Sequence, residues 1–167
     1  MNVSASEHYE IVVAVTKLKA QYFRFMDTKD WSSWSDLFTE DAVLENLSHR
    51  EHPLAGRDTI VDTVSRNLER MVTVHHGHMP EIEVIDSGRV NATWSMEDRL
   101  LVNDPSQPGF SLYGFGHYHD HYVLEEKWRI KRIELVRLHV ETTSHHNRWN
   151  WKGPGGLGTW RLGGSES

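Results

Sequence analysis

The sequence contains no cysteine, and this absence excludes several kinds of chemistry at once. Without thiols the chain can form no disulfide, thiol nucleophile, iron–sulfur cluster or thiolate zinc site. It also lacks any apolar run near the ~20 residues that a membrane-spanning helix needs. Met1 to Glu10 is polar, and no basic segment precedes a short apolar one, so the features of a signal peptide are missing. We therefore expect a cytoplasmic protein with no membrane partner.

Concentrated positive charge is missing as well. The chain has 18 Lys and Arg residues against 24 Asp and Glu, a formal net charge of −6, and the basic residues form no cluster. Binding to nucleic acid or to an anionic membrane needs a basic patch, so we expect neither partner. The sequence also has no glycine-rich nucleotide-binding loop, and we expect the protein to work without a cofactor.

Histidine, in contrast, is abundant, with 12 in 167 residues. Half of the histidines stand in two short strings, namely His75, His76 and His78, and then His117, His119 and His121. Imidazole changes its charge near neutral pH and is also a common metal ligand. The two strings are therefore the first places to look for acid–base or metal chemistry.

The first part of the chain has the periodicity of helices. Ser4, followed three residues later by Glu7, forms a capping-box signature. Apolar residues then recur at helical spacing, which predicts one long amphipathic helix over residues 5–28. Asp30 is placed to cap a short second helix that runs from Trp31 to Phe38.

The pattern then changes from helical to extended. A strand is expected over Ala42 to Leu47, Gly56 breaks the chain, and apolar residues from Ile60 to Met71 mark a third helix. Four long segments rich in β-branched and aromatic residues follow, at 73–86, 89–103, 111–124 and 128–142. Three helices followed by antiparallel strands predict an α+β domain over residues 1–143, with the helices packed on one face of a curved sheet.

The end of the chain departs from this pattern. Residues 144–167 are rich in glycine and contain Trp149, Trp151 and Trp160. A buried Trp removes ~150–250 Å² of surface from water. We therefore expect this C-terminal extension to pack over the domain or over a neighbouring subunit, where its glycines would let the backbone turn across the mouth of a pocket.

Several landmarks stand in an order that resembles the SnoaL-like proteins of the nuclear transport factor 2-like superfamily. In the first half these are Tyr22-x4-Asp27, Asp30-Trp31-x2-Trp34-x2-Leu37-Phe38-x2-Asp41-Ala42 and Gly56-x3-Ile60. In the second half they are His75-His76, Ala92-x-Trp94, Gly116-x-Tyr118-x-Asp120-x-Tyr122 and Trp128-Arg129-Ile130. The resemblance covers about residues 7–142. It implies a cone-shaped barrel, made of a strongly curved mixed or antiparallel sheet with three helices packed on it.

This superfamily contains scytalone dehydratase, bile-acid 7α-dehydratase, hexachlorocyclohexane dehydrochlorinase, polyketide cyclases, ketosteroid isomerase and non-enzymatic binding domains, so the fold alone does not decide the function. In the dehydratase and dehydrochlorinase branch, an Asp at the end of the first helix orients a His on the first long strand. Asp27 and His75 stand at those two positions. Tyr22 matches a polar pocket position of that branch, His117 is similar to the second histidine of scytalone dehydratase, and Arg137 matches a late pocket arginine. The strand Asp and the Tyr/Asp pair of ketosteroid isomerase find no match.

The resemblance implies a cofactor-independent lyase. His75 would take a proton, Asp27 would hold its ring, and Tyr22, His117 or Arg137 would polarise or protonate the departing group. The leaving group would be water, HX or a small fragment such as formaldehyde, from a hydrophobic aromatic or polycyclic substrate. The expected substrate-binding residues are Trp31, Trp34, Phe38, Trp94, Tyr118, Trp149 and Trp151. We expect the chain to form a homodimer or homotrimer.

Simpler interpretations remain open at this point. Tyr22 lies on the apolar stripe of the first helix and could belong to the core, and Asp27 could be an ordinary carboxylate at a helix end. Strand alternation places His75 on the face opposite to His76 and His78. His117, His119 and His121 share one strand face, which allows a metal site, although we expect none. An isomerase or polyketide-type cyclase, or a small-molecule-binding domain without catalysis, would use the same pocket.

Overall fold

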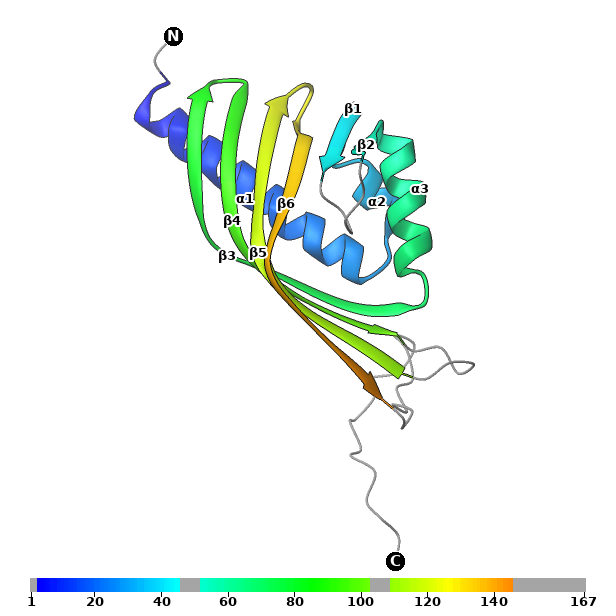
Figure 1. Ribbon diagram of the computed structural model, residues 1–167. Coiled ribbons are helices and arrows are strands. Elements are labelled where there is room, and N and C mark those ends of the chain that lie inside the picture. Colours follow the sequence, from blue (N-terminus) through cyan, green and yellow to red (C-terminus); the bar gives the residue numbers. More distant parts are fainter. Residues whose placement is uncertain (1–2, 46–51, 103–108, 146–167) are drawn as a thin grey trace, which may run out of the picture.

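The computed structural model describes residues 3–45, 52–102 and 109–145, and Figure 1 shows their arrangement. Three helices are present: α1 (Ala5–Asp27), α2 (Trp31–Ser35) and α3 (Arg57–Leu68). Six strands form one sheet: β1 (Phe38–Glu45), β2 (Leu54–Ala55), β3 (Met71–Asp86), β4 (Arg89–Val102), β5 (Gly109–Leu124) and β6 (Trp128–His145). Within these residues no helix is both long and apolar enough to span a membrane.

The sheet has the strand order β2-β1-β6-β5-β4-β3. β1 and β6 run parallel and all other neighbours are antiparallel, so the sheet is mixed. It curves strongly but does not close into a complete barrel, because β2 and β3 remain edge strands. The α+β class and the packing of three helices on a curved sheet are confirmed.

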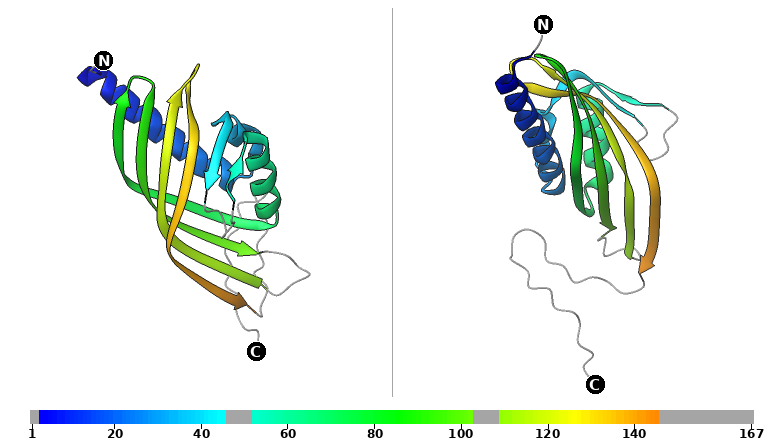
Figure 2. Two further views of the ribbon diagram at one scale, coloured as in Figure 1. Left: turned by 45° about the horizontal axis from the view of Figure 1, so that its top comes forward. Right: turned by 90° about the vertical axis from the view of Figure 1, so that its left-hand side faces the viewer.

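Helix α1 crosses one face of the sheet, which we call the inner face (Figures 1 and 2). It begins as the capping box predicts, with the amide of Glu7 donating to the Ser4 hydroxyl at 3.2 Å. Its apolar stripe is buried, which for a helix of this length stabilises the packing more than helix propensity does. Gly77 of β3 allows the closest approach, because a β-carbon there would lie 2.6 Å from the ring of Phe23.

The structure assigns two residues to other elements than predicted, shifts several other boundaries by one to a few residues and adds one strand. α2 ends at Ser35, and Phe38 already belongs to β1, because the amide of Ile130 donates to the Leu37 carbonyl at 2.7 Å and starts the pairing with β6. Met71 belongs to β3 instead of α3, since it pairs with Val102 of β4. Helical spacing in the sequence carries no information about such long-range pairing. The two-residue strand β2 is too short to show any periodicity.

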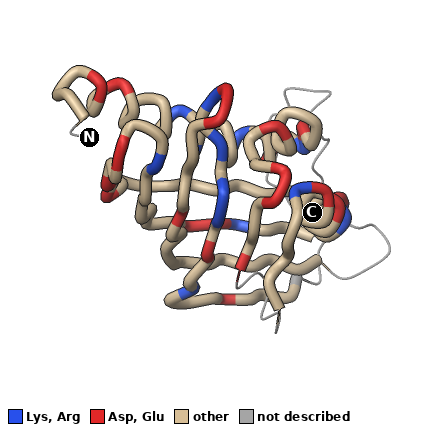
Figure 3. Tube along the Cα trace, turned by 90° about the horizontal axis from the view of Figure 1, so that it is seen from above, with Lys and Arg blue, Asp and Glu red and all other residues tan. Residues whose placement is uncertain are grey.

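The inner face carries the core and the outer face is open. On β5 the buried residues Gly116, Tyr118, Asp120 and Tyr122 alternate with partly exposed ones. The strand ends of β4, β5 and β6 run on past the helices, so no helix of the described residues covers the inner face there (Figure 1). Acidic and basic residues are interspersed along the described trace instead of gathering by sign (Figure 3).

Candidate active site

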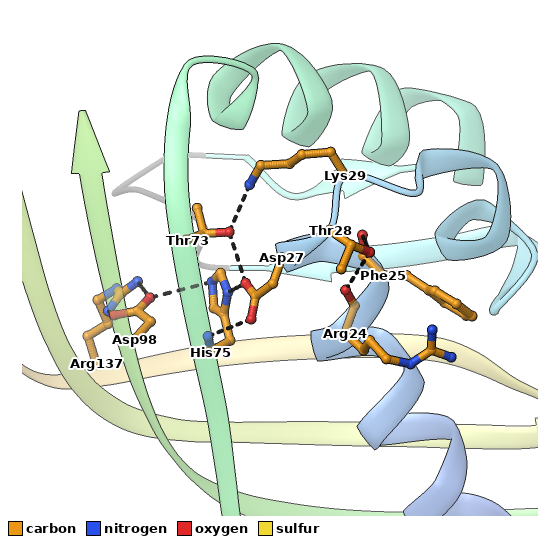
Figure 4. Close-up of polar contacts among 9 residues, drawn as sticks. All are labelled: Arg24, Phe25, Asp27, Thr28, Lys29, Thr73, His75, Asp98 and Arg137. Carbon is orange, nitrogen blue, oxygen red and sulfur yellow. Dashed lines mark hydrogen bonds and ion pairs between the residues drawn. The ribbon is translucent and has the colours of Figure 1, made fainter. Parts of the chain in front are cut away.

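The end of α1 and the start of β3 bring Asp27 and His75 together (Figure 4). The ring Nδ1 of His75 lies 2.6 Å from the Oδ1 atom of Asp27, and the backbone amide of His75 donates to Oδ2 at 2.9 Å. The same carboxylate therefore holds both the ring and the backbone of His75. Phe23 stacks on the imidazole with a centroid distance of 6.4 Å and an angle of 9° between the ring planes.

This contact defines the chemical state of the imidazole. When the ring is neutral, the Asp27 carboxylate accepts the Nδ1 proton, and Nε2 is left with a free lone pair. Nε2 faces the Oδ2 atom of Asp98, 4.0 Å away. His75 is only 7% exposed, so its basic nitrogen lies at the wall of the interior and not in bulk water.

Two further residues extend the hydrogen-bond chain behind Asp27. The Thr73 hydroxyl donates to Oδ1 of Asp27 at 2.9 Å, and the Lys29 ammonium donates to the Thr73 hydroxyl at 2.7 Å (Figure 4). Burial disfavours the charged ammonium and lowers the pKa of Lys29 to about 8, although the negative charge of Asp27 acts in the opposite direction.

An ion pair between the buried Asp98 and the partly exposed Arg137 faces the dyad from β4 and β6. Arg137 donates to both carboxylate oxygens of Asp98, at 2.9 and 2.5 Å, and Asp98 is 2% exposed. Burial opposes the charge of the guanidinium, but the hydrogen bonds and the charge of Asp98 outweigh it and raise the pKa of Arg137. The pair fits because residue 114 is glycine: a β-carbon there would collide with both side chains.

These groups surround a cavity of about 80 Å³ between α1, α3 and the inner face. Its polar lining consists of Tyr22, Asn67, His75, Asp98, Tyr118 and Arg137, and the remaining lining is apolar. Burial, followed by interactions with neighbouring acidic and phenolic groups, raises the pKa of Tyr22 and of Tyr118 well above the ordinary value for tyrosine. Both hydroxyls are therefore protonated at neutral pH. Because Tyr22 and Tyr118 are hydrogen-bonded to each other, one of the two hydroxyl protons remains free to donate to an oxygen in the cavity.

The structure brings together most of the predicted catalytic residues, but not His117. Tyr22, His75 and Arg137 line the cavity, and Asp27 lies directly behind His75. His117 alternates with the buried Tyr118 and therefore projects from the outer face of β5, away from the cavity.

The other two histidines of that string share the outer face with His117. His119 contacts the Thr93 hydroxyl at 3.2 Å, and His121 contacts Asn91 at 2.7 Å. None of the three histidines belongs to the cavity lining. In the described residues, no group of three or more His, Asp or Glu side chains is arranged to hold a metal ion.

Four of the seven aromatic residues expected to bind substrate do not line the cavity. Trp34 packs against Tyr22 at 5.4 Å and against Phe38 at 4.8 Å, so it supports the wall without lining the cavity. Trp31, Phe38 and Trp94 are likewise absent from the described lining, to which only Tyr118 of this group belongs. The expected pocket residues Trp149 and Trp151 lie outside the described part of the chain.

Sequence reasoning missed Asp98, Thr73 and Lys29. A usable signal existed for Asp98: it continues the alternation of Trp94 and Met96, and a carboxylate in a row of apolar inward positions needs a buried partner. Thr73 and Lys29 have no comparable signal, because their contacts depend on the fold of the turn after α1.

The fold and the site together define a class of protein, an α+β cone with a histidine–carboxylate pair at the wall of a small internal cavity. The family model of the SnoaL-like domain matches residues 7–134. The chain therefore belongs to the SnoaL-like family.

Solved structures of similar fold include a candidate dehydratase and two dehydrochlorinases. A candidate scytalone dehydratase from Novosphingobium aromaticivorans is 22% identical, with 87% of this chain and 94% of that chain covered and a TM-score of 0.71. A type 3 hexachlorocyclohexane dehydrochlorinase from Novosphingobium barchaimii is 15% identical, with 84% and 94% covered and a TM-score of 0.71. A type 2 hexachlorocyclohexane dehydrochlorinase is 15% identical, with 91% and 99% covered and a TM-score of 0.73. At these identities the likeness shows the fold alone.

Proposed function

We propose that the protein is a cofactor-independent lyase in which Asp27 and His75 act as a dyad that removes a proton from a hydrophobic substrate. The observation that carries this proposal is the 2.6 Å contact between Nδ1 of His75 and Asp27 at the wall of a mostly apolar cavity. A carboxylate in that place keeps the ring in one tautomer and stabilises the imidazolium that forms when Nε2 takes a proton.

The groups around the cavity suffice to write the elimination. Nε2 of His75 takes a proton from carbon, the C–H electron pair becomes the new double bond, and the leaving group departs with its own bonding pair. Tyr22 or Tyr118 donates a proton or a hydrogen bond to the departing oxygen or halide, and Arg137 stabilises the negative charge that develops. The donating tyrosine regains its proton from the imidazolium.

A small carbon fragment could leave by the same base. In that case His75 takes a hydroxyl proton, the O–H electron pair becomes the carbonyl bond of formaldehyde, and the C–C pair stays on the larger product. The imidazolium then returns its proton to that carbon. Both reactions need a neutral His75 with a free Nε2 beside the Asp27 carboxylate. The geometry therefore supports a lyase reaction in general, and the leaving group depends on the substrate.

The size and charge of the site favour a neutral, partly protruding substrate. The cavity of about 80 Å³ is small beside the roughly 300–1,000 Å³ of common ligand pockets, so only the reacting end of an aromatic or polycyclic molecule fits inside. The rest can lie along the inner face beyond the helices, next to Leu100 and Leu112, which face each other on β4 and β5. Arg137 is already paired with Asp98, so a substrate carboxylate would have to displace an internal partner.

The proposed quaternary structure is a homodimer or homotrimer. Val136 and Leu138 of β6 are exposed, at 37% and 67%, so part of the sheet offers apolar surface to a second copy. Size-exclusion chromatography with light scattering measures the oligomeric state directly.

The experiment that tests the lyase proposal combines two single variants with their double variant. Wild type, Asp27→Asn, His75→Ala and the double variant are incubated with hydroxylated aromatic and polycyclic compounds, and conjugated absorbance and product mass are followed. Asp27→Asn should lose ~10³–10⁴-fold in kcat, because Asn can hold the ring but cannot stabilise its charged form. The double variant should be hardly slower than the slower single variant, since the two residues act as a unit.

The neighbouring His76→Ala is the matched control, because the side chain of His76 is 58% exposed and lies on the other strand face. It should keep wild-type turnover. Additive losses in the double variant would contradict the dyad. A product of unchanged mass would indicate an isomerase or cyclase, and ligand binding without any turnover in the wild type would indicate a binding domain.

A further inference from the structure

The turn after α1 directs a lysine back toward the dyad. Lys29 is the only non-glycine residue in the described chain with a positive φ, 60°. This left-handed conformation is disfavoured for a long side chain, and here two backbone bonds hold it, from Lys29 to the Met26 carbonyl at 3.2 Å and from Asp30 to the Phe25 carbonyl at 2.9 Å. As a result, the Lys29 ammonium reaches the Thr73 hydroxyl (Figure 4).

The direction of the hydrogen bonds in this chain follows from the donor inventory. A charged ammonium can only donate, so the Thr73 oxygen must accept from Lys29. The single hydroxyl proton of Thr73 is then directed to Asp27, at 2.9 Å. While Lys29 is charged, the Asp27 carboxylate therefore accepts three hydrogen bonds, one from Thr73 and two from His75.

We propose that Lys29 is a positioning residue that acts through the Thr73 hydroxyl and thereby sets how strongly Asp27 holds the ring of His75. The proposal rests on the assignment of Asp27 and His75 as the dyad. Lys29 itself does not belong to the described cavity lining, so it acts on the base and not on the substrate.

The groups around Lys29 allow its ammonium to lose a proton within the pH range in which the protein can be studied. Asp27 of α1 and Thr73 of β3 lie on one side, and the ring of Trp31 of α2 lies 5.7 Å from Nζ. Burial against this surrounding lowers the pKa of Lys29 to about 8. Above that pH the neutral amine can accept a hydrogen bond, and the Thr73 proton can turn toward it.

Loss of the proton from Lys29 should therefore strengthen the hydrogen bond between Asp27 and the ring of His75. Asp27 loses a hydrogen-bond donor and a nearby positive charge, so it becomes a stronger acceptor for the Nδ1 proton of His75. The imidazolium is then better stabilised, and His75 is a better base. Turnover should rise by roughly two- to tenfold as the pH passes through about 8.

The test uses the free full-length protein and needs no substrate. The Nδ1 proton resonance of His75 is followed by NMR from pH 6.5 to about 9.5, in the range where Lys29 titrates. In the wild type the resonance should move downfield near pH 8, because the bond to Asp27 strengthens. In Lys29→Met it should start at the downfield position and show no step. In Lys29→Arg it should stay upfield without a step, since the guanidinium remains charged.

A second pair of variants tests the route through the hydroxyl. Thr73→Val removes the link and should weaken the step, whereas Thr73→Ser keeps the hydroxyl and should restore it. The proposal is overturned if the step near pH 8 persists in Lys29→Arg or Lys29→Met, or if Thr73→Val leaves it unchanged. These NMR outcomes are separate from those of the dyad variants, because no turnover is measured. If the wild type shows no change of the His75 resonance near pH 8, the role of Lys29 is wrong and the lyase proposal is unaffected. If the lyase assay finds no turnover, the NMR result for Lys29 still holds.

Discussion

On the inner face of the sheet, His75, Asp98 and Asp120 are buried beside a fixed partner, and the side chains of the partners Asp27 and Arg137 are only 22% and 23% exposed. On the outer face, acidic and histidine side chains of the same kinds are partly exposed, as for the pair His76 and Glu97, which are 58% and 30% exposed. The two faces carry similar residue types, but these side chains are less exposed to solvent on the inner face than on the outer face. Desolvation strengthens every interaction with a defined partner, whereas exposed pairs are screened by water and contribute about 0–1 kcal/mol. The dyad that we propose therefore lies on the inner face, whereas His119 and His121 line a wider hollow of about 530 Å³ formed by residues of β3, β4 and β5.

The largest expected effect on stability comes from the most deeply buried ion pair. Lys19 and Asp120 are 2.7 Å apart, fully buried, and the Tyr122 hydroxyl donates to the same carboxylate oxygen at 2.5 Å. Lys19→Met should lower the free energy of unfolding by about 3–5 kcal/mol, because it leaves a buried charge without its partner. Urea denaturation followed by circular dichroism measures the change.

Two controls sharpen this prediction. Lys17→Met changes an exposed lysine of the same helix and should alter stability by less than about 0.5 kcal/mol. Lys19→Met combined with Asp120→Asn should recover part of the loss, since the stranded charge is removed as well. If the two lysine variants were equally mild, the contrast between buried and exposed charges would be wrong for this protein.

The next effect concerns the ion pair that lines the cavity. Gly114→Ala should displace the Arg137–Asp98 pair, because the added β-carbon collides with both side chains. We expect kcat to fall by roughly 10- to 100-fold, a loss typical of a misplaced charged group in an active site. Gly88→Ala is the control, since its β-carbon would meet only the Asp86 carboxylate at an ordinary 3.7 Å. Steady-state kinetics of both variants test this prediction. Equal kcat in Gly114→Ala and Gly88→Ala would show that the Arg137–Asp98 pair has no part in turnover.

Lys29 should also leave a signature in the pH dependence of stability. Burial lowers its pKa to about 8 from the ordinary 10.5, so between these values the unfolded chain keeps a proton that the folded protein has lost. The free energy of unfolding should therefore rise with pH in this window, by on the order of 1 kcal/mol for a side chain that solvent still screens in part. Below pH 8 both states hold the proton and the contribution is constant.

Denaturation curves at several pH values test this prediction. Lys29→Met should remove the contribution of Lys29 to the rise, and the exposed Lys17→Met should leave the rise unchanged. A rise of the same size in wild type and in Lys29→Met would assign it to another group, such as the buried Lys19, whose pKa is also lowered by burial.

A smaller effect is expected from the C-terminal extension. No helix of the described residues covers the inner face where β6 ends at His145, and Trp149, Trp151 and Trp160 follow in the extension that begins there. Deleting residues 148–167 should raise KM or lower kcat several-fold while changing the melting temperature little, if the extension covers the site. Unchanged activity would show that the extension does not contribute to the pocket, and dissociation into monomers would show that it joins subunits.

The smallest effect should come from the outer histidines. Replacing His117, His119 and His121 together by Gln should change kcat/KM by less than about twofold, because these side chains contact only their strand neighbours on the outer face. The same substitution at the single inner residue His75 should abolish measurable turnover. A large loss in the triple variant would place a functional site on the outer face and break the contrast between the two faces.

Local sequence signals predicted most of the elements. Ser4 and Glu7 predicted the start of α1, and the β-branched segments predicted four strands whose boundaries are correct to within a few residues. The errors lie where distant pairing overrides local pattern, as at Phe38 and Met71, which follow a helical pattern but join β1 and β3. Of the candidate site, Tyr22, Asp27, His75 and Arg137 were accessible through the family resemblance, and Asp98 through its alternation with Trp94 and Met96.

The sequence by itself determined the α+β class, the absence of thiol chemistry and the alternation that sets His75 opposite His76 and groups His117 with His119 and His121, because periodicity and composition are local properties. Which of the two strand faces turns inward was decided by the tertiary structure, and this is why the expected pocket position of His117 was wrong. The tertiary structure alone decided which of these residues meet. Asp27 and His75 are 48 residues apart, and Asp98 and Arg137 are 39 apart. The contacts of Lys29 with Thr73 depend on one left-handed residue in a turn. A side chain becomes reactive through burial beside a fixed partner, and that property arises only when distant segments pack together.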